Sequence, residues 1–379
     1  MKGGVAGSTA RIAQFLSEGG YDVHVCVFPD SSETVPEGRK MEGNIPIYWR
    51  RIKSAGGKLT DYMDRTRRMA DAILELDAEI EFDLFHGVFL PAAFPCLQVA
   101  RRRRRPVIAS ARGSDATLWL KNPVSHSIVV SVLRRADRIT APSSDSLRRL
   151  EAVADIGARS DVVLNSVAEA PVPWSRESST GGVVGTVSQF YPVKRIPLLI
   201  EAYARVPRAL RSRLLLVGDF PEEAERQRAF QAMRRCGVAD EVQVTGYVDV
   251  QEVRRYLHSM RVFVQCSASE GFSGALLEAA SAGVPIVSTA VGGVAELLAA
   301  APEAPSLLET EEANLAEAIE RVLGDDDLAA SMSTAARRAV RSFSAEREKN
   351  CWLEVHRKAL EGSVQVEALH GAGGSSLRG

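Results

Sequence analysis

Two glutamates, Glu270 and Glu278, could do chemistry together, because only a run of small and apolar residues separates them in SEGFSGALLEAASAGVPIVST. A carboxylate accepts hydrogen bonds, and its two oxygens can hold two neighbouring hydroxyl groups. The small residues Gly271, Ser273 and Gly274 would let a bulky group approach the backbone closely. The stretch therefore predicts a site for a polyhydroxy ligand, although both glutamates could equally be solvated surface residues.

The elements around these glutamates have clear sequence signals. RVFVQCS is typical of a buried strand, EGFS of a turn, and GALLEAASA of a helix that Ser273 caps and Gly283 ends. The turn would follow the carboxyl end of a strand, where α/β sheets bind ligands. The first amides of the helix lack internal partners and suit a phosphate. Because carboxylates repel phosphate, we expect Glu278 to bind two ribose hydroxyls and Glu270 a second polyol, as in a sugar nucleotide.

Length and composition limit the classes of protein. A chain of 379 residues is too long for one ordinary core and predicts two domains. With 45% hydrophobic and 25% charged residues, it is typical of globular proteins. The formal net charge of −1 gives no overall attraction to nucleic acid, which we do not expect as a partner.

The cysteines are scattered and lack the paired spacing of a zinc site or a disulfide scaffold; they are Cys26, Cys96, Cys236, Cys266 and Cys351. The start has no charged and then apolar leader, and no apolar run approaches about 18 residues. These features predict a protein of the reducing cytoplasm.

Short apolar runs alternate with helical stretches along the chain, which predicts an α/β protein with two doubly wound domains. The first domain is predicted over residues 1–168 and the second over 182–342, joined by a linker rich in Pro, Ser and Gly. A surface helix at 343–361 is expected to pack back toward the first domain, followed by a flexible tail at 362–379.

The amino terminus departs from this pattern. MKGGVAGSTARIAQFL runs from a glycine loop straight into a helix that Ser8 or Thr9 could cap and that Gly19 and Gly20 should end. A doubly wound domain has a strand before such a loop, so its first strand is expected to be missing. The glycine spacing fits a dinucleotide loop poorly, which argues against an NAD site.

The pattern Glu270, seven residues, Glu278, within SASEGFSGALLEAASAGVPIVSTAVGGVAEL, resembles the signature of retaining glycosyltransferases of family 4, which have the GT-B fold. The phrases VVLNSV, GTVSQFYPVKRIPLLIEAY, LLLVGDF and VQVTGYV follow in the family's order, and the likeness covers nearly the whole chain. It implies two Rossmann-like domains facing across a cleft. The second would hold a nucleotide-sugar donor and the first a hydroxyl-bearing acceptor.

The resemblance also implies roles for individual residues. Glu278 would hold the donor ribose and Glu270 the transferred sugar, while Lys194, in YPVKR, would neutralise the leaving diphosphate. A lysine and helix amides can stabilise that negative charge without a metal or another cofactor. Further donor contacts are implied for the small loops and the base site: Gly3, Gly4, Tyr247, Gly271, Phe272, Ser273 and Gly274.

Two positions depart from the family pattern. Gln189 stands where the family usually has an arginine, so one charge contact to the diphosphate is lost. Arg112, in SARGSDA, stands where many members have a histidine. It could supply positive charge for catalysis, or it could pair with Asp115 and do nothing more.

Two further features have both a functional and a structural interpretation. His86, in DLFHGVFL, could face an acceptor hydroxyl, but a histidine at a strand end is more often structural. The run Arg101–Arg105 could touch anionic lipid or an acidic acceptor, but such a run before Pro106 is more often a solvated helix end.

The resemblance implies a metal-independent, retaining hexosyltransferase, and the high Arg and Ala content predicts a bacterial source. The enzyme would use a nucleoside-diphosphate sugar, with UDP the expected nucleotide, and a glycan, glycolipid or secondary metabolite as acceptor. A catalytically silent member that binds a sugar nucleotide or serves as an auxiliary subunit is the alternative, motivated by Gln189, Arg112 and the missing strand. A GT-B sugar-nucleotide epimerase is a third hypothesis.

Overall fold

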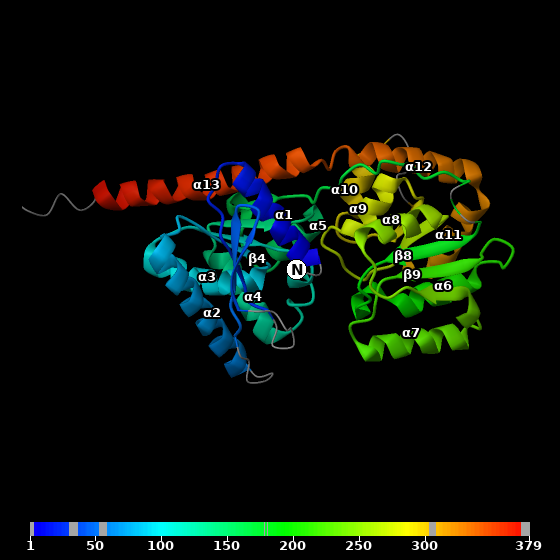
Figure 1. Ribbon diagram of the computed structural model, residues 1–379, viewed down its shortest axis with the longest axis horizontal. Helices are drawn as coiled ribbons and strands as arrows, with labels where there is room; N and C mark the ends of the chain where they lie inside the picture. The colour runs from blue at the N-terminus through cyan, green and yellow to red at the C-terminus, as the bar shows by residue number, and fades with distance from the viewer. Residues whose placement is uncertain are drawn as a thin grey trace, which may run out of the picture. The chain divides into compact units, whose positions relative to one another are not determined.

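The computed structural model describes residues 4–29, 37–52, 59–177, 179, 181–302 and 308–372 (Figure 1). The chain divides into two compact units. Unit 1 comprises Met1–Pro142, Ser146–Val163 and Glu348–Gly379, and unit 2 comprises Ser143–Asp145 and Leu164–Arg347. In the described ranges, every helix is too short or too polar to cross a membrane.

Unit 1 contains two separate sheets. One has the strand order β1-β3-β2, and the other is a four-stranded parallel sheet with the order β4-β5-β6-β7. The elements are α1 (Gly4–Glu18), β1 (Val25–Val27), β2 (Gly38–Glu42), β3 (Ile45–Trp49), α2 (Leu59–Ile80), β4 (Phe85–Val88), α3 (Leu90–Arg103), β5 (Val107–Ser110), η1 (Ser114–Ala116), α4 (Pro123–Arg135), β6 (Arg138–Ala141), α5 (Ser144–Glu151), η2 (Gly157–Arg159), β7 (Ser160–Val162) and α13 (Ala345–Ala372).

The first described element of unit 1 is a helix. α1 begins at Gly4, and among the described residues β1 and β4 share no ladder of hydrogen bonds. The predicted end of α1 at Gly19 and Gly20 is confirmed, but the predicted caps are wrong. Ser8 and Thr9 lie inside the helix, where their hydroxyls donate to the carbonyls one turn earlier, both at 2.9 Å.

The carboxyl-terminal helix is more buried and longer than the predicted surface helix. α13 continues beyond residue 361 to Ala372 (Figure 1). Trp352 is fully buried and packs with Val355 against Ile108 of β5 and Phe15 of α1. The predicted end at residue 361 was wrong, and the burial was underestimated because charged residues dominate the helix, while a narrow apolar stripe is enough to dock it.

Unit 2 is built on one six-stranded parallel sheet with the order β10-β9-β8-β11-β12-β13. Five apolar runs predict strands here, and all five strands are present as β8 to β12: GVVGTVSQF, RLLLVGDF, EVQVTGYV, RVFVQCS and VPIVST. The strand β13 was not anticipated. The elements are β8 (Val183–Val187), η3 (Pro192–Lys194), α6 (Ile196–Arg205), β9 (Arg213–Val217), α7 (Glu223–Arg235), η4 (Ala239–Glu241), β10 (Val242–Val244), α8 (Val250–Ser259), β11 (Val262–Gln265), α9 (Gly274–Ala282), β12 (Ile286–Thr289), α10 (Val294–Ala299), β13 (Leu308–Thr310), η5 (Glu312–Asn314), α11 (Leu315–Gly324) and α12 (Asp326–Val340).

The segment predicted as a linker is irregular, yet part of it is anchored in unit 2. Trp174 is buried, its backbone amide donates to the Ala282 carbonyl at 2.7 Å, and its indole donates to the Met260 carbonyl at 2.9 Å. Burial of such a large side chain holds the chain against the end of α9. The Pro, Ser and Gly content indicated the lack of regular structure but not this attachment.

Candidate functional site

The predicted strand, turn and helix at the opening glutamates are confirmed. β11 leads into the turn, and Ser273 caps α9 by accepting from the Leu276 amide at 3.3 Å. Gly283 ends the helix in the left-handed region at φ 81°. The exposed Gly274 begins α9, so the unpaired amides of its first turn lie at the carboxyl end of the sheet.

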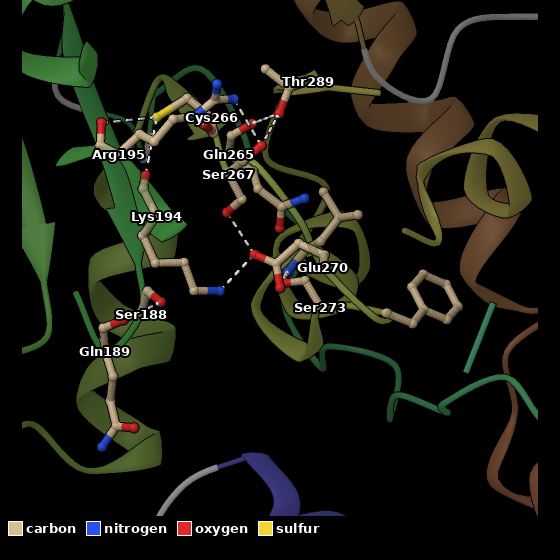
Figure 2. Close-up of polar contacts among 12 residues, drawn as sticks. Ser188, Gln189, Lys194, Arg195, Gln265, Cys266, Ser267, Glu270, Ser273 and Thr289 are labelled. Carbon is tan, nitrogen blue, oxygen red and sulfur yellow. Dashed lines mark hydrogen bonds and ion pairs between the residues drawn. The ribbon is translucent and has the colours of Figure 1, made fainter. Parts of the chain in front are cut away.

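The structure brings two predicted catalytic residues together. The Lys194 ammonium lies 2.5 Å from Oε1 of Glu270, and the Ser267 hydroxyl donates to the same oxygen at 2.6 Å (Figure 2). Both charged side chains are largely buried, with exposed fractions of 21% for Lys194 and 12% for Glu270. This ion pair joins the loop after β8 to the loop after β11, beside the start of α9.

Arg195 holds these two loops in register, a role that sequence reasoning missed. Its backbone is left-handed at φ 52°, and its guanidinium donates to the Cys266 carbonyl at 2.6 Å and to the Ser267 carbonyl at 2.9 Å. Burial raises the pKa of the Cys266 thiol to about 11, which makes it an unreactive core residue. The only sequence signal for Arg195 was its position next to Lys194.

A glycine pair also shapes the site without having been predicted. A Cβ on Gly292 would lie 2.4 Å from the Gly271 carbonyl, and one on Gly293 would lie 2.1 Å from the Phe272 ring. These glycines therefore let the loop after β12 pack directly on the turn that carries Glu270. The adjacent glycines in AVGGVAEL were the available signal.

Glu278 lies one turn into α9 with its side chain exposed. Partial desolvation raises the pKa of this carboxyl, and the positive charge of Arg254 opposes the shift. Glu278 is therefore accessible to a ligand, and a hydroxyl could donate to it. The described contacts include no hydrogen bond between Glu278 and Glu270.

The remaining donor-site candidates of unit 2 lie in loops. Phe272 is buried, with its ring against Phe343 at 5.2 Å between centroids, so its backbone rather than its side chain is available to a ligand. Gly271 is buried as well. Tyr247 is 69% exposed, and Figure 2 shows the amide of Gln189 directed away from the carboxylate of Glu270.

Arg112 belongs to unit 1. Its contacts change both predicted interpretations, the pairing with Asp115 and the supply of positive charge for catalysis. The carboxylate of Asp115 accepts from backbone amides, including that of Arg112 at 2.9 Å, and forms no described bond with the guanidinium. The guanidinium lies 5.1 Å from the Trp352 ring centre, with Nε and Nη1 buried and unpaired among the described residues. Burial lowers the pKa of Arg112 to about 10, so it stays cationic.

His86 lies inside strand β4 rather than after it, which corrects the sequence interpretation. Its ring is 2.6 Å from the Ser110 hydroxyl and packs against His356 and Trp352. Burial, together with the nearby charge of Arg112, holds the pKa of His86 well below its ordinary value. These contacts favour the structural interpretation. Gly4 is the exposed first residue of α1, and Gly3 lies outside the described residues.

Comparisons with known proteins agree with this geometry. Residues 2–170 match the model "Glycosyltransferase Family 4", and residues 174–339 match "Glycosyl transferases group 1". The chain is 23% identical over 350 residues to N-acetyl-alpha-D-glucosaminyl L-malate synthase of Bacillus anthracis. The matched region covers 89% of this chain and 88% of that protein.

Two solved structures show the same fold. Sucrose-phosphate synthase from Thermosynechococcus elongatus superposes with a TM-score of 0.81 at 18% identity, covering 95% of this chain and 94% of the other. HepE of Anabaena, solved with UDP and glucose, gives a TM-score of 0.75 at 19% identity, covering 94% and 96%. The fold is GT-B, with two Rossmann-like α/β units, and the chain belongs to the family 4 glycosyltransferases.

Proposed function

We propose that this glycosyltransferase moves a sugar from a nucleoside-diphosphate sugar to a hydroxyl group of an acceptor, with retention of configuration and without a metal ion. The observation that carries the proposal is the ion pair between Lys194 and Glu270 beside the capped start of α9. The ammonium of Lys194, a carboxylate that can accept hydrogen bonds from hydroxyl groups, and the first amides of α9 thus lie in one small region of unit 2.

Each group has a role in that reaction. When the diphosphate leaves the sugar, its negative charge would be stabilised by Lys194 and by the first amides of α9. Glu270 would accept hydrogen bonds from the hydroxyls of the transferred sugar, and Glu278 from those of the ribose. Departure of the diphosphate on the face that the acceptor attacks would retain the anomeric configuration.

The comparisons support a UDP-sugar as donor. HepE was solved in complex with UDP and with UDP-glucose, and the Bacillus relative is named for transfer of N-acetylglucosamine to L-malate. We propose by analogy that unit 2 binds a UDP-sugar and that unit 1 binds a hydroxyl-bearing acceptor. A bacterial source and a cytoplasmic location remain predictions that belong with this proposal.

A peripheral membrane contact through Arg101–Arg105 is a weaker part of the proposal. Arg103 forms an ion pair with the buried Asp77 at 2.7 Å, and Arg105 lies 3.9 Å from Asp83. Two arginines of the run are thus directed to carboxylates of unit 1. All five are exposed as residues, so a lipid surface could still reach them.

Calorimetric titration with UDP, GDP, ADP, CDP and dTDP, with chelator present, tests the proposal. The wild type should bind UDP, and Glu278→Ala should weaken that binding by about 1 to 3 kcal/mol through lost charge-assisted hydrogen bonds. Glu317→Ala, at an exposed position on α11, is the matched control and should bind as the wild type does.

The other outcomes are informative. Unchanged affinity in Glu278→Ala would remove this residue from the ribose site. Binding that disappears with chelator would contradict metal independence. Failure of all five nucleotides to bind would favour the silent family member, for which Gln189 is the motivating departure.

A further inference from the structure

A second group of charged side chains lies in unit 1 and shares no residue with the site proposed for sugar transfer. A cavity of about 450 Å³ opens beside the start of β6. Five cationic side chains and a single carboxylate line it: Arg134, Arg135, Arg138, Arg159, Lys358 and Asp137.

The topology explains how these residues meet. α4 ends at Arg135, β6 begins at Arg138, and η2 ends at Arg159 directly before β7. The amino ends of neighbouring parallel strands lie at one edge of a sheet, and β6 pairs with β7. This edge is opposite to the carboxyl ends, where α/β sheets hold their substrates. The cavity is therefore not part of the proposed transfer site.

Three of the cations are fixed in place. Arg138 donates to the Ala158 carbonyl at 2.9 Å and pairs with Asp161, yet its Nε is buried with no hydrogen-bond partner in the described chain. Arg159 donates to the Ala136 carbonyl at 2.5 Å. Lys358 lies 3.3 Å from the same Asp161. Lys358 also lies 3.7 Å from Glu354, whereas Arg159 forms no ion pair with a described residue, so the five cations of the lining still outnumber the carboxylates that face them.

Arg134 and Arg135 are the adaptable part of the cavity. Both are exposed, and neither forms an ion pair with a described residue. Asp137, the only carboxylate in the lining, already accepts from the Val107 amide at 2.7 Å. Arginines at the end of a helix also stabilise its dipole, which alone would account for this pair. That explanation does not cover Arg138, Arg159 and Lys358, which converge on the same hollow from other elements.

We propose that this cavity is a binding site for a phosphate group. A guanidinium group can donate two parallel hydrogen bonds to two oxygens of one phosphate. Guanidinium groups that are already held in place lose little conformational entropy when they bind. The phosphate could belong to a soluble phosphorylated molecule or to a lipid head group. The exposed arginines that end α3 are near the same edge, because α3 ends before β5 and packs on α4.

Two probes distinguish these sources. Inorganic pyrophosphate is titrated by calorimetry into the wild type, and vesicles of phosphatidylglycerol with phosphatidylcholine are compared with pure phosphatidylcholine vesicles in flotation. Arg134→Gln/Arg135→Gln should weaken the binding of at least one anionic probe by about tenfold or more. Arg234→Gln/Arg235→Gln, the equivalent exposed pair at the end of α7, is the matched control and should leave binding unchanged.

Lys194→Ala separates this site from the donor site, which could also take pyrophosphate. Pyrophosphate binding that survives Lys194→Ala but is weakened in Arg134→Gln/Arg135→Gln assigns a soluble phosphate to the cavity. Vesicle binding that needs phosphatidylglycerol and is weakened in the same double variant assigns a lipid head group. If Arg134→Gln/Arg135→Gln weakens the binding of neither probe, or if neither probe binds the wild type, the proposal is overturned.

Discussion

The ion pair between Lys194 and Glu270 makes each residue depend on the other. Each charge is neutralised by its partner at 2.5 Å, and Ser267 also donates to Glu270. A donor that offers phosphate to Lys194 and hydroxyls to Glu270 replaces one charged contact with two. The pair keeps two partly buried charges from being left uncompensated, which would be costly.

Lys194→Ala should lower turnover more than it weakens donor binding, because the lysine charge meets the negative charge that develops on the leaving diphosphate. We expect kcat to fall by about 100-fold, the effect of losing one transition-state contact of this kind. The measurement is kcat from steady-state transfer, with Kd for the nucleotide from calorimetry.

Lys349→Ala is the control for this experiment, because Lys349 pairs at the surface with Glu18 at 3.0 Å and is part of neither proposed site. It should leave both quantities unchanged. Equal losses of kcat and affinity in Lys194→Ala would show instead that this lysine contributes only to binding.

At the scale of elements, α9 depends on its carboxyl-terminal glycine. Gly283 has a left-handed backbone, and a Cβ there would lie 2.8 Å from the Ser333 hydroxyl. Gly283→Ala should therefore lower the free energy of unfolding by about 1 to 2 kcal/mol through backbone strain and crowding. Gly274→Ala is the matched control, since nothing lies within 4 Å of its Cβ position.

Urea denaturation of the two variants gives the comparison. Gly274→Ala should be as stable as the wild type or slightly more stable. Equal stability of Gly283→Ala and Gly274→Ala would mean that α9 tolerates an alternative ending.

Much of unit 2 could be predicted from its sequence because its signals are local. The β-branched runs predicted five of its strands, and Ser273 and Gly283 fixed the ends of α9. The ion pair between Lys194 and Glu270 could not be derived in this way, since 76 residues separate its partners. Only the resemblance to the family suggested that both belong to one site.

Unit 1 was predicted less well because its elements depend on distant contacts. β2 has mostly exposed, charged residues and forms only by pairing with β3, so its sequence lacks an apolar pattern. Trp352 is buried because α1 and β5 supply its surroundings. His86 appeared to end a strand, although the ladder of β4 extends past it to Val88.

At the scale of the whole molecule, the buried histidines of unit 1 link stability to pH. Burial lowers the pKa of His356 from about 6.5 to about 4, and its Nδ1 is 2.8 Å from the Trp352 carbonyl. The unfolded chain therefore takes up a proton on this residue at a higher pH than the folded chain does. Its contribution to stability is complete above about pH 6.5 and is lost as the pH falls toward 4.

We expect the free energy of unfolding to fall by up to about 3 kcal/mol over that window on account of His356. His356→Gln keeps an amide that can donate to the Trp352 carbonyl but cannot titrate, so its stability should depend less on pH. Urea unfolding at pH 7.5 and 5 measures the difference. His126→Gln, a change on α4, is the control and should retain the slope of the wild type. Equal slopes in all three proteins would contradict the assignment to His356.

The division of unit 1 into two sheets has a consequence for how the molecule opens. The sheet of β1, β2 and β3 has a small core of its own around Ala13, Val25 and Ile47, whereas β5 and β6 lie within a much larger one. Because the described residues form no ladder between the two sheets, the smaller sheet can unfold while the larger stays folded. Its amides should exchange with deuterium first, and a protease should make its first cuts there.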